Sequence, residues 1–443
     1  MLGLIKAAEG GDGKEESSYN YFTEAQKALI SGDLILPAHI KAHDKPPCKR
    51  SEIKTVLLTG STGKVGPYMV EELAKRSLDK IFCLIRSKDD ASAKERLIKA
   101  LDEKNLTAAI DLSRIVAVAG EVTEPNLGLA QDKYDMLASS IDAVVHVAVK
   151  GNLMEPYRKG DGNASFDLRS VNVIGTRNIL EFCGTGKTKQ VLHASTLLAC
   201  HKVGENDALH EGWCQSQDVF DMPNVGYPIS KFIAESLAFQ ASERGIPIHV
   251  HRLPGLLGDK NGCFSFPNNH AMLRLLGFAK LGVMPSNPIP MQLLAVDKAC
   301  ALSCQLFFDD EAPPEVYNIT NPHMCVLQDF PGLASEFGFK IDVVEYKEFF
   351  EKLNENDEYK AVFPYREVDF EGDRFIDFTT SPVALQTWIN NPEEFFISRK
   401  LEAILKEDYR EHTQHPMDIL RRDMQFAKDT NIFEKFGLKK FTT

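Results

Sequence analysis

Tyr227 and Lys231, in the stretch VGYPISKFIAESLAFQ, have side chains that together could transfer a proton. Proline is tolerated in the first turn of a helix, where its missing N–H has no intrahelical partner, so Pro228 places a helix start near Tyr227. Two residues four apart then lie on one face of this helix. A phenol beside an ammonium group can serve as a proton donor, but the same pair can also be ordinary surface. Apolar residues support the helix at the expected spacing: Ile229, Phe232, Ile233, Leu237 and Phe239.

A glycine-rich turn lies between the apolar run TVLLT and the helical segment PYMVEEL. Its glycines are spaced G-x-x-G-x-x-G, and they let the chain turn tightly and bring backbone N–H groups against a pyrophosphate. Strand, turn and helix in this order predict a dinucleotide-binding site in preference to a simple strand–helix turn. The predicted pyrophosphate-binding residues are Gly60, Thr62, Gly63, Lys64, Val65 and Gly66.

The next apolar run, KIFCLIR, indicates which dinucleotide is bound. A protein that binds NAD is expected to carry Asp or Glu about 20 residues after the glycine turn, to bind the ribose hydroxyls. Arg86 stands at that place, with Lys88 and Arg96 close behind it. A guanidinium suits the extra 2′-phosphate of NADP, so the sequence predicts NADPH. The alternative is a solvated arginine at the end of a strand.

Short apolar runs alternate with helix-length segments from residue 53 onward, which is typical of a parallel, doubly wound sheet of the Rossmann type. One such run, VLHAST, ends in Ser195 and Thr196, at the sheet edge where ligands of these folds bind. A last strand, EVYNIT, is expected to return to the sheet. We predict an N-terminal arm or linker (1–50), an NADP-binding domain (51–258, with a returning segment at about 291–322) and a smaller, mostly helical substrate lobe (259–290 and 323–443). In that lobe the acidic, aromatic stretch 345–373 is expected to be solvated.

Composition narrows the function classes. The net charge of −12 and the lack of a long basic run argue against a nucleic-acid partner. No apolar run reaches the roughly 18 residues that a membrane span needs, and MLGLIKAAEGGDGKEE is neither a signal nor a transit peptide. The nine cysteines show no pairing or metal-binding spacing, so we expect reduced thiols, a cytoplasmic protein and no metal.

Three features are better read as structure than as chemistry. The stretch CGTGKTK (183–189) resembles the end of a phosphate-binding loop, but Glu181 stands where that motif needs glycine, and a glycine-terminated helix is expected instead. Cys300 and Cys304 are expected to pack in the core. His249 and His251 alternate along a strand and are likewise expected to be core or edge residues.

The order of these motifs resembles the extended short-chain dehydrogenase/reductases, and more narrowly their thioester reductase-like branch. That branch includes the terminal reductase domains of non-ribosomal peptide synthetases, aminoadipate reductase and carboxylic acid reductases. The resemblance covers about residues 34–330. The motifs that carry it are DLILPAHI, VLLTGSTGKVG, FCLIRS, NLGL, VVHVAV, EPY, VNVIGTRNIL, HAST, GYPISKFIAE, RLPGLLGDKNG and VDKACA.

The resemblance implies roles for particular residues. Tyr227 would be the general acid, and Lys231 would lower its pKa and hold the nicotinamide ribose. Thr196 would bond the substrate oxygen, and Asn172 would support the proton relay. Arg252 is expected to be structural. The remaining expected cofactor contacts are Glu121, Val122, Val147, Ala148, Pro254 and Leu256.

The implied activity is NADPH-dependent reduction of an acyl thioester to an aldehyde, with further reduction to the alcohol left open. The chain departs from the family where relatives read HNAA, because it has Val147 in place of asparagine, and Pro228 after the tyrosine is uncommon. No carrier attachment motif or adenylation region is found, so the acyl group is expected to come from a separate carrier protein or from coenzyme A. Three alternatives stay open: a reductase or epimerase acting on a free carbonyl or sugar nucleotide, a non-catalytic NADP-binding sensor, and reduction of fatty acyl-CoA to alcohol.

Overall fold

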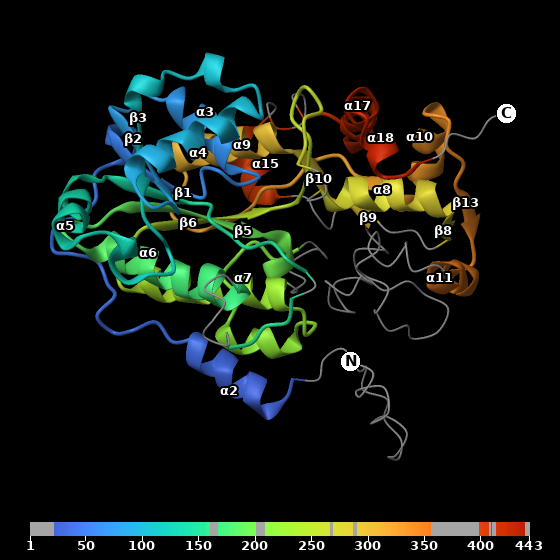
Figure 1. The fold of residues 1–443 in the computed structure, drawn as a ribbon. Coiled ribbons are helices and arrows are strands. Elements are labelled where there is room, and N and C mark those ends of the chain that lie inside the picture. The colour runs from blue at the N-terminus through green and yellow to red at the C-terminus, as the bar shows by residue number, and fades with distance from the viewer. Residues whose placement is uncertain are drawn as a thin grey trace.

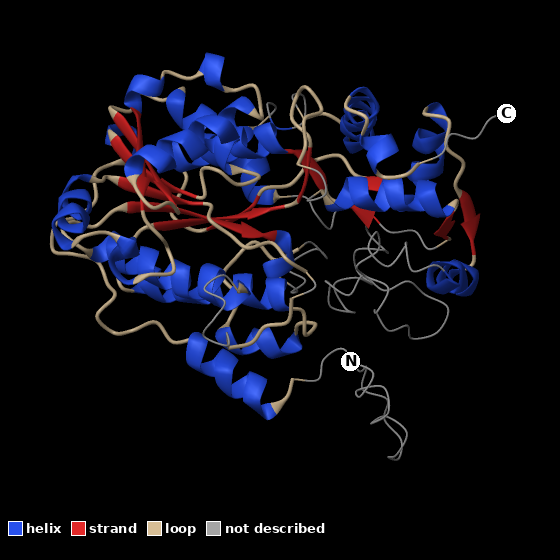
Figure 2. Cartoon of the chain, in the orientation of Figure 1, coloured by secondary structure: helices blue, strands red, loops and turns tan. Residues whose placement is uncertain are grey.

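A seven-stranded parallel sheet forms the centre of the molecule, with helices on both faces (Figures 1 and 2). The computed structural model describes residues 22–153, 155–159, 167–200, 209–265, 269–286, 290–355, 398–406, 409 and 413–438. The strands run in the order β11-β6-β5-β4-β1-β2-β3. Their bounds are β1 Thr55–Thr59, β2 Lys80–Ile85, β3 Ile115–Ala119, β4 Ala143–His146, β5 Gln190–Thr196, β6 Ile248–Leu253 and β11 Val316–Asn318. The predicted Rossmann-type sheet is confirmed, including the returning strand β11, which pairs with β6 in parallel.

The strand order changes direction between β1 and β4. Strands β1, β2 and β3 follow one another on one side, and β4, β5 and β6 do so on the other. At such a switch point the loops that leave the two central strands diverge, and a crevice opens at their carboxyl ends. Thr59 of β1 pairs with His146 of β4 at that end, so the glycine turn and the segment after β4 leave the sheet side by side.

Each face of the sheet has its own layer of helices, as Figure 1 shows. The strands are buried on both faces and therefore read as nearly continuous apolar runs. One layer contains α3 (Gly66–Ala74), α4 (Asp90–Asp102) and α9 (Val296–Phe308). The other contains α5 (Gln131–Ser140), α6 (Gly175–Gly184), α7 (Gly226–Glu243) and the N-terminal α2 (Glu24–Asp33).

The described part of the N-terminal segment packs against α7. Thr23 caps α2, and the buried side chains of Ile30 and Leu36 belong to the same core cluster as the apolar residues of α7. The amide of Gln240 on α7 donates to Leu34 O at 2.7 Å and accepts from Leu36 N at 3.1 Å. Residues 22–40 are thus bound to the helix that carries Tyr227, while the predicted division into domains stays a prediction.

The C-terminal part forms a mostly helical lobe beside the sheet (Figure 1, right). It has a core cluster of its own, and β7, which follows β6 in the chain, pairs in parallel with β10 in a separate two-stranded sheet. Residues 356–373 of the acidic, aromatic stretch lie outside the described residues. Along the described residues, no helix is long and apolar enough to cross a membrane. The remaining elements are β7 Gly255–Leu257, α8 His270–Leu281, β8 Val283–Pro285, β9 Pro290–Met291, β10 Leu293–Ala295, β12 Cys325–Val326, α10 Phe330–Glu336, β13 Asp342–Val344, α11 Tyr346–Glu355, α15 Arg399–Leu405, α17 Pro416–Asp429 and α18 Ile432–Lys435.

The features read as structural in the sequence have structural roles here. Helix α6 ends at Gly184, and the ammonium of Lys189 donates to Ala138 O within α5 and to Thr185 O and Lys187 O in the loop after α6. Cys300 and Cys304 are buried on α9, and the Cys304 sulfur lies 3.4 Å from that of Met69. These predictions are confirmed.

Four histidines are buried in the sheet: His146, His193, His249 and His251. The rings of His249 and His251 have no hydrogen-bond partner among the described residues, and His249 stacks on Tyr317 with ring centres 5.7 Å apart. Burial lowers the pKa of His146 and of His251 to about 3, and it lowers the pKa of the other two well below 6.5. All four are therefore neutral in the folded chain at neutral pH.

We expect acid to destabilise the fold because of these buried rings. The unfolded chain takes up protons below about pH 6.5 while the folded chain does not, so stability is full above that pH and falls toward pH 3. Each such histidine removes about 1.4 kcal/mol per pH unit in that window. The free energy of unfolding, measured by urea titration between pH 4 and pH 7.5, should fall less steeply in His251→Phe than in the native chain. An equal slope in His251→Phe and in the native chain would contradict the interpretation.

Candidate active site

The glycine turn fits closely between β1 and the segment that follows β4. Gly60 has a φ of +75°, and a Cβ atom on it would lie 2.6 Å from Ala148 N. A Cβ atom on Gly66, the first residue of α3, would lie 2.1 Å from Gly60 O. Side chains at either position would force the turn open. The resulting cradle of backbone at the N-terminus of α3 is of the kind that binds pyrophosphate.

The other predicted residues of the turn lie around this cradle. Val65 is the N-cap residue of α3, and Thr62 is half-buried. The Lys64 ammonium donates to Leu256 O on β7 at 3.0 Å, and burial lowers the pKa of Lys64 to about 8. Lys64 and Leu256 were predicted separately as cofactor contacts, and this hydrogen bond brings them together. Pro254, the third predicted contact in this region, stands two residues before Leu256 in the chain.

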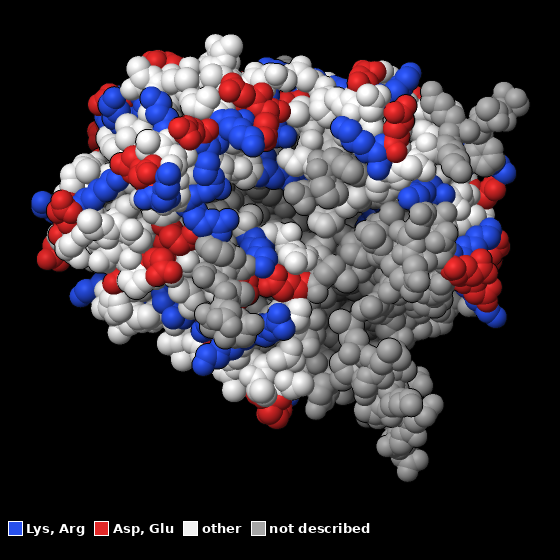
Figure 3. All heavy atoms as spheres, viewed as in Figure 1, with Lys and Arg blue, Asp and Glu red and all other residues white. Residues whose placement is uncertain are grey.

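The basic residues predicted to read the ribose phosphate share one exposed region. Arg86 directly follows β2, and the Arg96 guanidinium on α4 donates to Arg86 O. Lys88 is exposed nearby in the loop that leads to α4. Figure 3 shows lysine and arginine side chains, with some acidic ones, around the hollow in the middle of the face in view. The arrangement can attract a phosphate group.

Glu121 and Val122 follow the neighbouring strand β3. Glu121 Oε2 is buried and has no hydrogen-bond partner among the described residues. Val122 packs on Gly175 at the start of α6, where a Cβ atom would lie 3.1 Å from the valine methyl carbon. A buried carboxylate oxygen without a partner is costly, so the site is suited to a ligand that donates a hydrogen bond.

Thr196 and Tyr227 meet at the carboxyl end of β5. Tyr227 is the second residue of α7 and Pro228 the third, so the missing proline N–H falls in the first turn, as predicted from the sequence. Burial raises the pKa of the half-buried Tyr227 to about 12, and a hydrogen bond with the Thr196 side chain opposes the rise. The phenol is protonated at neutral pH.

Lys231 lies one turn further along α7 with its side chain fully enclosed. Its ammonium donates to Ala194 O at 2.8 Å and lies 3.3 Å from His193 Nε2. Burial lowers the pKa of Lys231 to about 8, and the charge of Glu235 works in the opposite direction. An ammonium has three protons, so these two acceptors leave one direction for a further acceptor.

Asn172 lies in a single π-helical turn, Ser170–Ile174, ahead of α6. Its Oδ1 accepts from Lys150 N at 2.8 Å, and its Nδ2 donates to Lys150 O at 3.0 Å and to Ser230 Oγ at 2.9 Å. Ser230 Oγ in turn donates to Tyr227 O. The amide thus ties the segment after β4, which contains Val147 and Ala148, to the first turn of α7.

The sequence analysis expected Arg252 to be structural, but it did not identify its partner Glu235 or the buried His193. Arg252 is fully enclosed and forms a 2.7 Å ion pair with Glu235, while Ser195 Oγ donates to the same carboxylate. Arg252 also donates to the carbonyls of His210 and Gly212. Glu235 stands four residues after Lys231 on α7, and this spacing was the signal that could have identified its carboxylate. No sequence pattern indicated His193.

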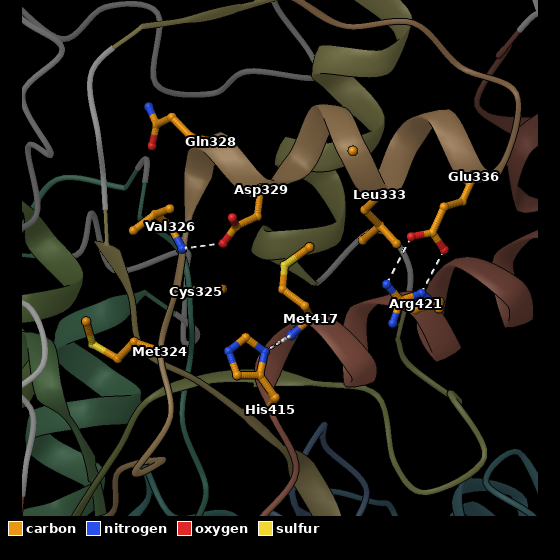
Figure 4. A pocket seen from close by; sticks show the side chains of 11 residues that line it. Met324, Cys325, Val326, Gln328, Asp329, Leu333, Glu336, His415, Met417 and Arg421 are labelled. Carbon is orange, nitrogen blue, oxygen red and sulfur yellow. Dashed lines mark hydrogen bonds and ion pairs between the residues drawn. The ribbon is translucent and has the colours of Figure 1, made fainter.

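A groove of about 610 Å³ lies in the helical lobe, between β12, α10 and α17 (Figure 4). Along one side, the Arg421 guanidinium on α17 pairs with Glu336 on α10 at 2.7 Å. At the other end, His415 Nδ1 accepts from Met417 N. Its lining mixes apolar and charged side chains without a periodic pattern, so the groove could not be predicted from the sequence. The lining residues are Met324, Cys325, Val326, Gln328, Asp329, Gly332, Leu333, Glu336, His415, Met417 and Arg421.

Comparison with known proteins agrees with this fold. The structure is similar to the terminal R domain from the myxalamid PKS-NRPS biosynthetic pathway, with a TM-score of 0.75 and 24% identity over 91% of this chain and 98% of that one. The R domain of a nonribosomal peptide synthetase from Mycobacterium tuberculosis gives a TM-score of 0.60 at 22% identity, over 92% of this chain and 97% of that one.

Longer proteins share part of their sequence with the chain. One of the linear gramicidin synthase proteins of Brevibacillus parabrevis is 28% identical over 69% of this chain and 6% of its own length. L-2-aminoadipate reductase of Saccharomyces cerevisiae is 25% identical over 81% of this chain and 27% of its own length. The chain therefore spans only a minor part of these relatives.

The family model described as male sterility protein, NAD-binding, matches residues 58–302. This span is more than half of the chain, and it includes the glycine turn, β5 and α7. The chain therefore belongs to this family of NAD(P)-dependent oxidoreductases, and its fold is similar to that of the R domains described above.

Proposed function

We propose that this protein is an NADPH-dependent reductase of acyl thioesters that forms an aldehyde, which a second reduction could convert to the alcohol. The observation that carries the proposal is the meeting of Thr196, Tyr227 and Lys231 at one edge of the sheet, beside the glycine turn. The acyl group would arrive on a separate carrier protein or on coenzyme A.

The cofactor would be held by residues that already fit its parts. The glycine turn and the N-terminus of α3 suit the pyrophosphate. Arg86 and Arg96, with Lys88, suit the 2′-phosphate and favour NADPH over NADH. The unpartnered Glu121 oxygen suits the amino group of adenine. The third N–H of Lys231 suits a ribose hydroxyl.

When bound, the reduced nicotinamide would supply a hydride to the thioester carbonyl. The developing oxyanion needs hydrogen-bond donors at a fixed position, and the hydroxyls of Thr196 and Tyr227 are two such donors. Because Tyr227 is protonated at neutral pH, it can give its proton to that oxygen as general acid. The lowering of its pKa by Lys231 stays a prediction, since burial dominates in this structure. Collapse of the hemithioacetal would then release the thiol and the aldehyde.

Tyr227→Phe should separate chemistry from binding. Removal of the general acid should lower kcat about 100-fold or more, while the affinity for NADPH changes little. The measurement is NADPH oxidation against a panel of acyl-coenzyme A and acyl-pantetheine thioesters, with cofactor affinity from nicotinamide fluorescence. Turnover of small free carbonyls, with none on thioesters, would instead favour the free-carbonyl alternative. NADPH binding without turnover on either class would favour the sensor.

The dependence of activity on pH should show the ionisation of Lys231. Above about pH 8 its ammonium loses a proton, so activity should fall on the alkaline side. Charged or titratable groups that face it are His193 on β5 and Glu235 on α7, with His146 behind His193. His193→Leu removes an acceptor and should move the alkaline limb to lower pH. His193→Gln keeps an acceptor and should move it less; equal limbs in all three proteins would contradict this account.

Arg86→Glu should reverse the choice of cofactor. The carboxylate would repel a 2′-phosphate and could accept from ribose hydroxyls, so we expect the KM for NADPH to rise about tenfold or more and that for NADH to fall. Lys347→Glu, at an exposed position on α11 in the helical lobe, is the control for a change of charge. Equal use of both cofactors by the native chain would refute the NADPH assignment.

A further inference from the structure

Two motifs that the proposed chemistry leaves unused, DLILPAHI and EPY, meet Arg169 at one buried carboxylate. Asp33, the last residue of α2 and the first of DLILP, is only 3% exposed. It accepts a hydrogen bond from the hydroxyl of Tyr157, in EPY, at 2.7 Å. It also accepts two from the guanidinium of Arg169, in LRSVN, at 2.6 and 2.7 Å. Arg177 lies at 4.0 Å on the same carboxylate. The paired bonds to Arg169 are the strong, directional kind.

Tyr157 connects this carboxylate to the start of α7. The backbone of residues 155–157 lies against Gly226, the first residue of that helix. A Cβ atom on Gly226 would lie 2.2 Å from Glu155 O and 2.7 Å from Tyr157 N, so the two segments touch backbone to backbone. Tyr227 is the next residue. A displacement of the 155–157 segment would therefore displace the first turn that presents the phenol.

Arg169 connects the same carboxylate to Asn172. It directly precedes the π-helical turn Ser170–Ile174, and Asn172 in that turn is bound to Lys150 and Ser230. Glu155 links the two branches, because its carboxylate accepts from Leu168 N at 3.0 Å and pairs with the Lys150 ammonium at 2.7 Å. The two backbone segments are thus held to each other as well as to Asp33.

The geometry points to Asp33 as a positioning residue of the active site: we propose that α2, through Tyr157 and Arg169, sets the positions of Tyr227 and Asn172. A carboxylate with three donors is well compensated for its burial, but its loss leaves a guanidinium and a phenol hydroxyl without a partner. The segments they belong to then have no fixed position. The inference rests on the proposed function only in taking Tyr227 and Asn172 as active-site residues.

The test uses the full chain with Asp33→Asn, which keeps the shape of the side chain and removes its charge. We expect kcat to fall about tenfold, because misplacement of a catalytic group slows chemistry more than it weakens binding. The KM for NADPH should rise by a smaller factor than kcat falls, since the glycine turn is built on β1 and α3 and has no bond to Asp33. Glu24→Gln, on the exposed part of the same helix, is the matched control and should behave as the native chain. Tyr157→Phe is the second variant, for the case that Asp33→Asn does not fold. It removes a single hydrogen bond to Asp33, so its loss of kcat should be smaller.

Hydrogen exchange gives a readout that does not depend on turnover. In Asp33→Asn the amides of residues 155–159, 167–175 and 225–231 should exchange faster, while those of β1 and β2 stay as protected as in the native chain. Unchanged exchange in these segments, or an equal increase throughout the sheet, would overturn the proposal. An unchanged kcat with faster local exchange would also overturn it. A native chain that turns over no thioester would refute the proposed function alone, because the exchange pattern still decides whether Asp33 holds the two segments.

Discussion

The buried ion pair between Arg252 and Glu235 is the interaction on which the catalytic edge depends. It joins β6 to α7, and Ser195 binds the same carboxylate from β5, one residue before Thr196. Breaking a buried pair by removing one partner costs about 3–5 kcal/mol, because the other charge is left uncompensated. Glu235 lies one helical turn beyond Lys231, so the pair also fixes how α7 is rotated against the sheet. The phenol and the ammonium can face β5 only in that rotation.

This rotation explains how a lysine can be enclosed at the edge of a sheet. Burial disfavours its charged form, and three groups among the described residues offset the cost: Ala194 O, the neutral ring of His193 and the charge of Glu235. His193 can accept from the ammonium because its own pKa is well below 6.5. A protonated imidazole there would repel Lys231. The buried histidines that make the fold sensitive to acid thus include one on which the ammonium depends.

Much of the fold could be predicted from the sequence, because it depends on short-range patterns. Buried parallel strands read as apolar runs, and Pro228 marks the first turn of α7 since only there is its missing N–H harmless. The contacts within the site were harder to predict from the sequence. Periodicity does not give the pairing register across a sheet, so the contact of His193 with Lys231 could not be inferred. The partners of Asn172 depend on a π-helical turn, for which the sequence carries no signal. The predicted roles of the catalytic residues stay predictions.

Val147, the main departure from the resembled family, is best understood through its neighbour His146. The Val147 side chain is buried and offers no polar group. His146, which matches the first residue of HNAA, uses both ring nitrogens: Nδ1 bonds Thr59 Oγ1 at 2.7 Å, and Nε2 bonds Thr176 Oγ1 at 3.2 Å. Thr176 then donates to Asn172 O, and Thr59 Oγ1 accepts from Ala148 N. The His146 ring therefore connects β1, the segment after β4 and the π-helical turn of Asn172. These segments are held together at this edge of the site although residue 147 is a valine.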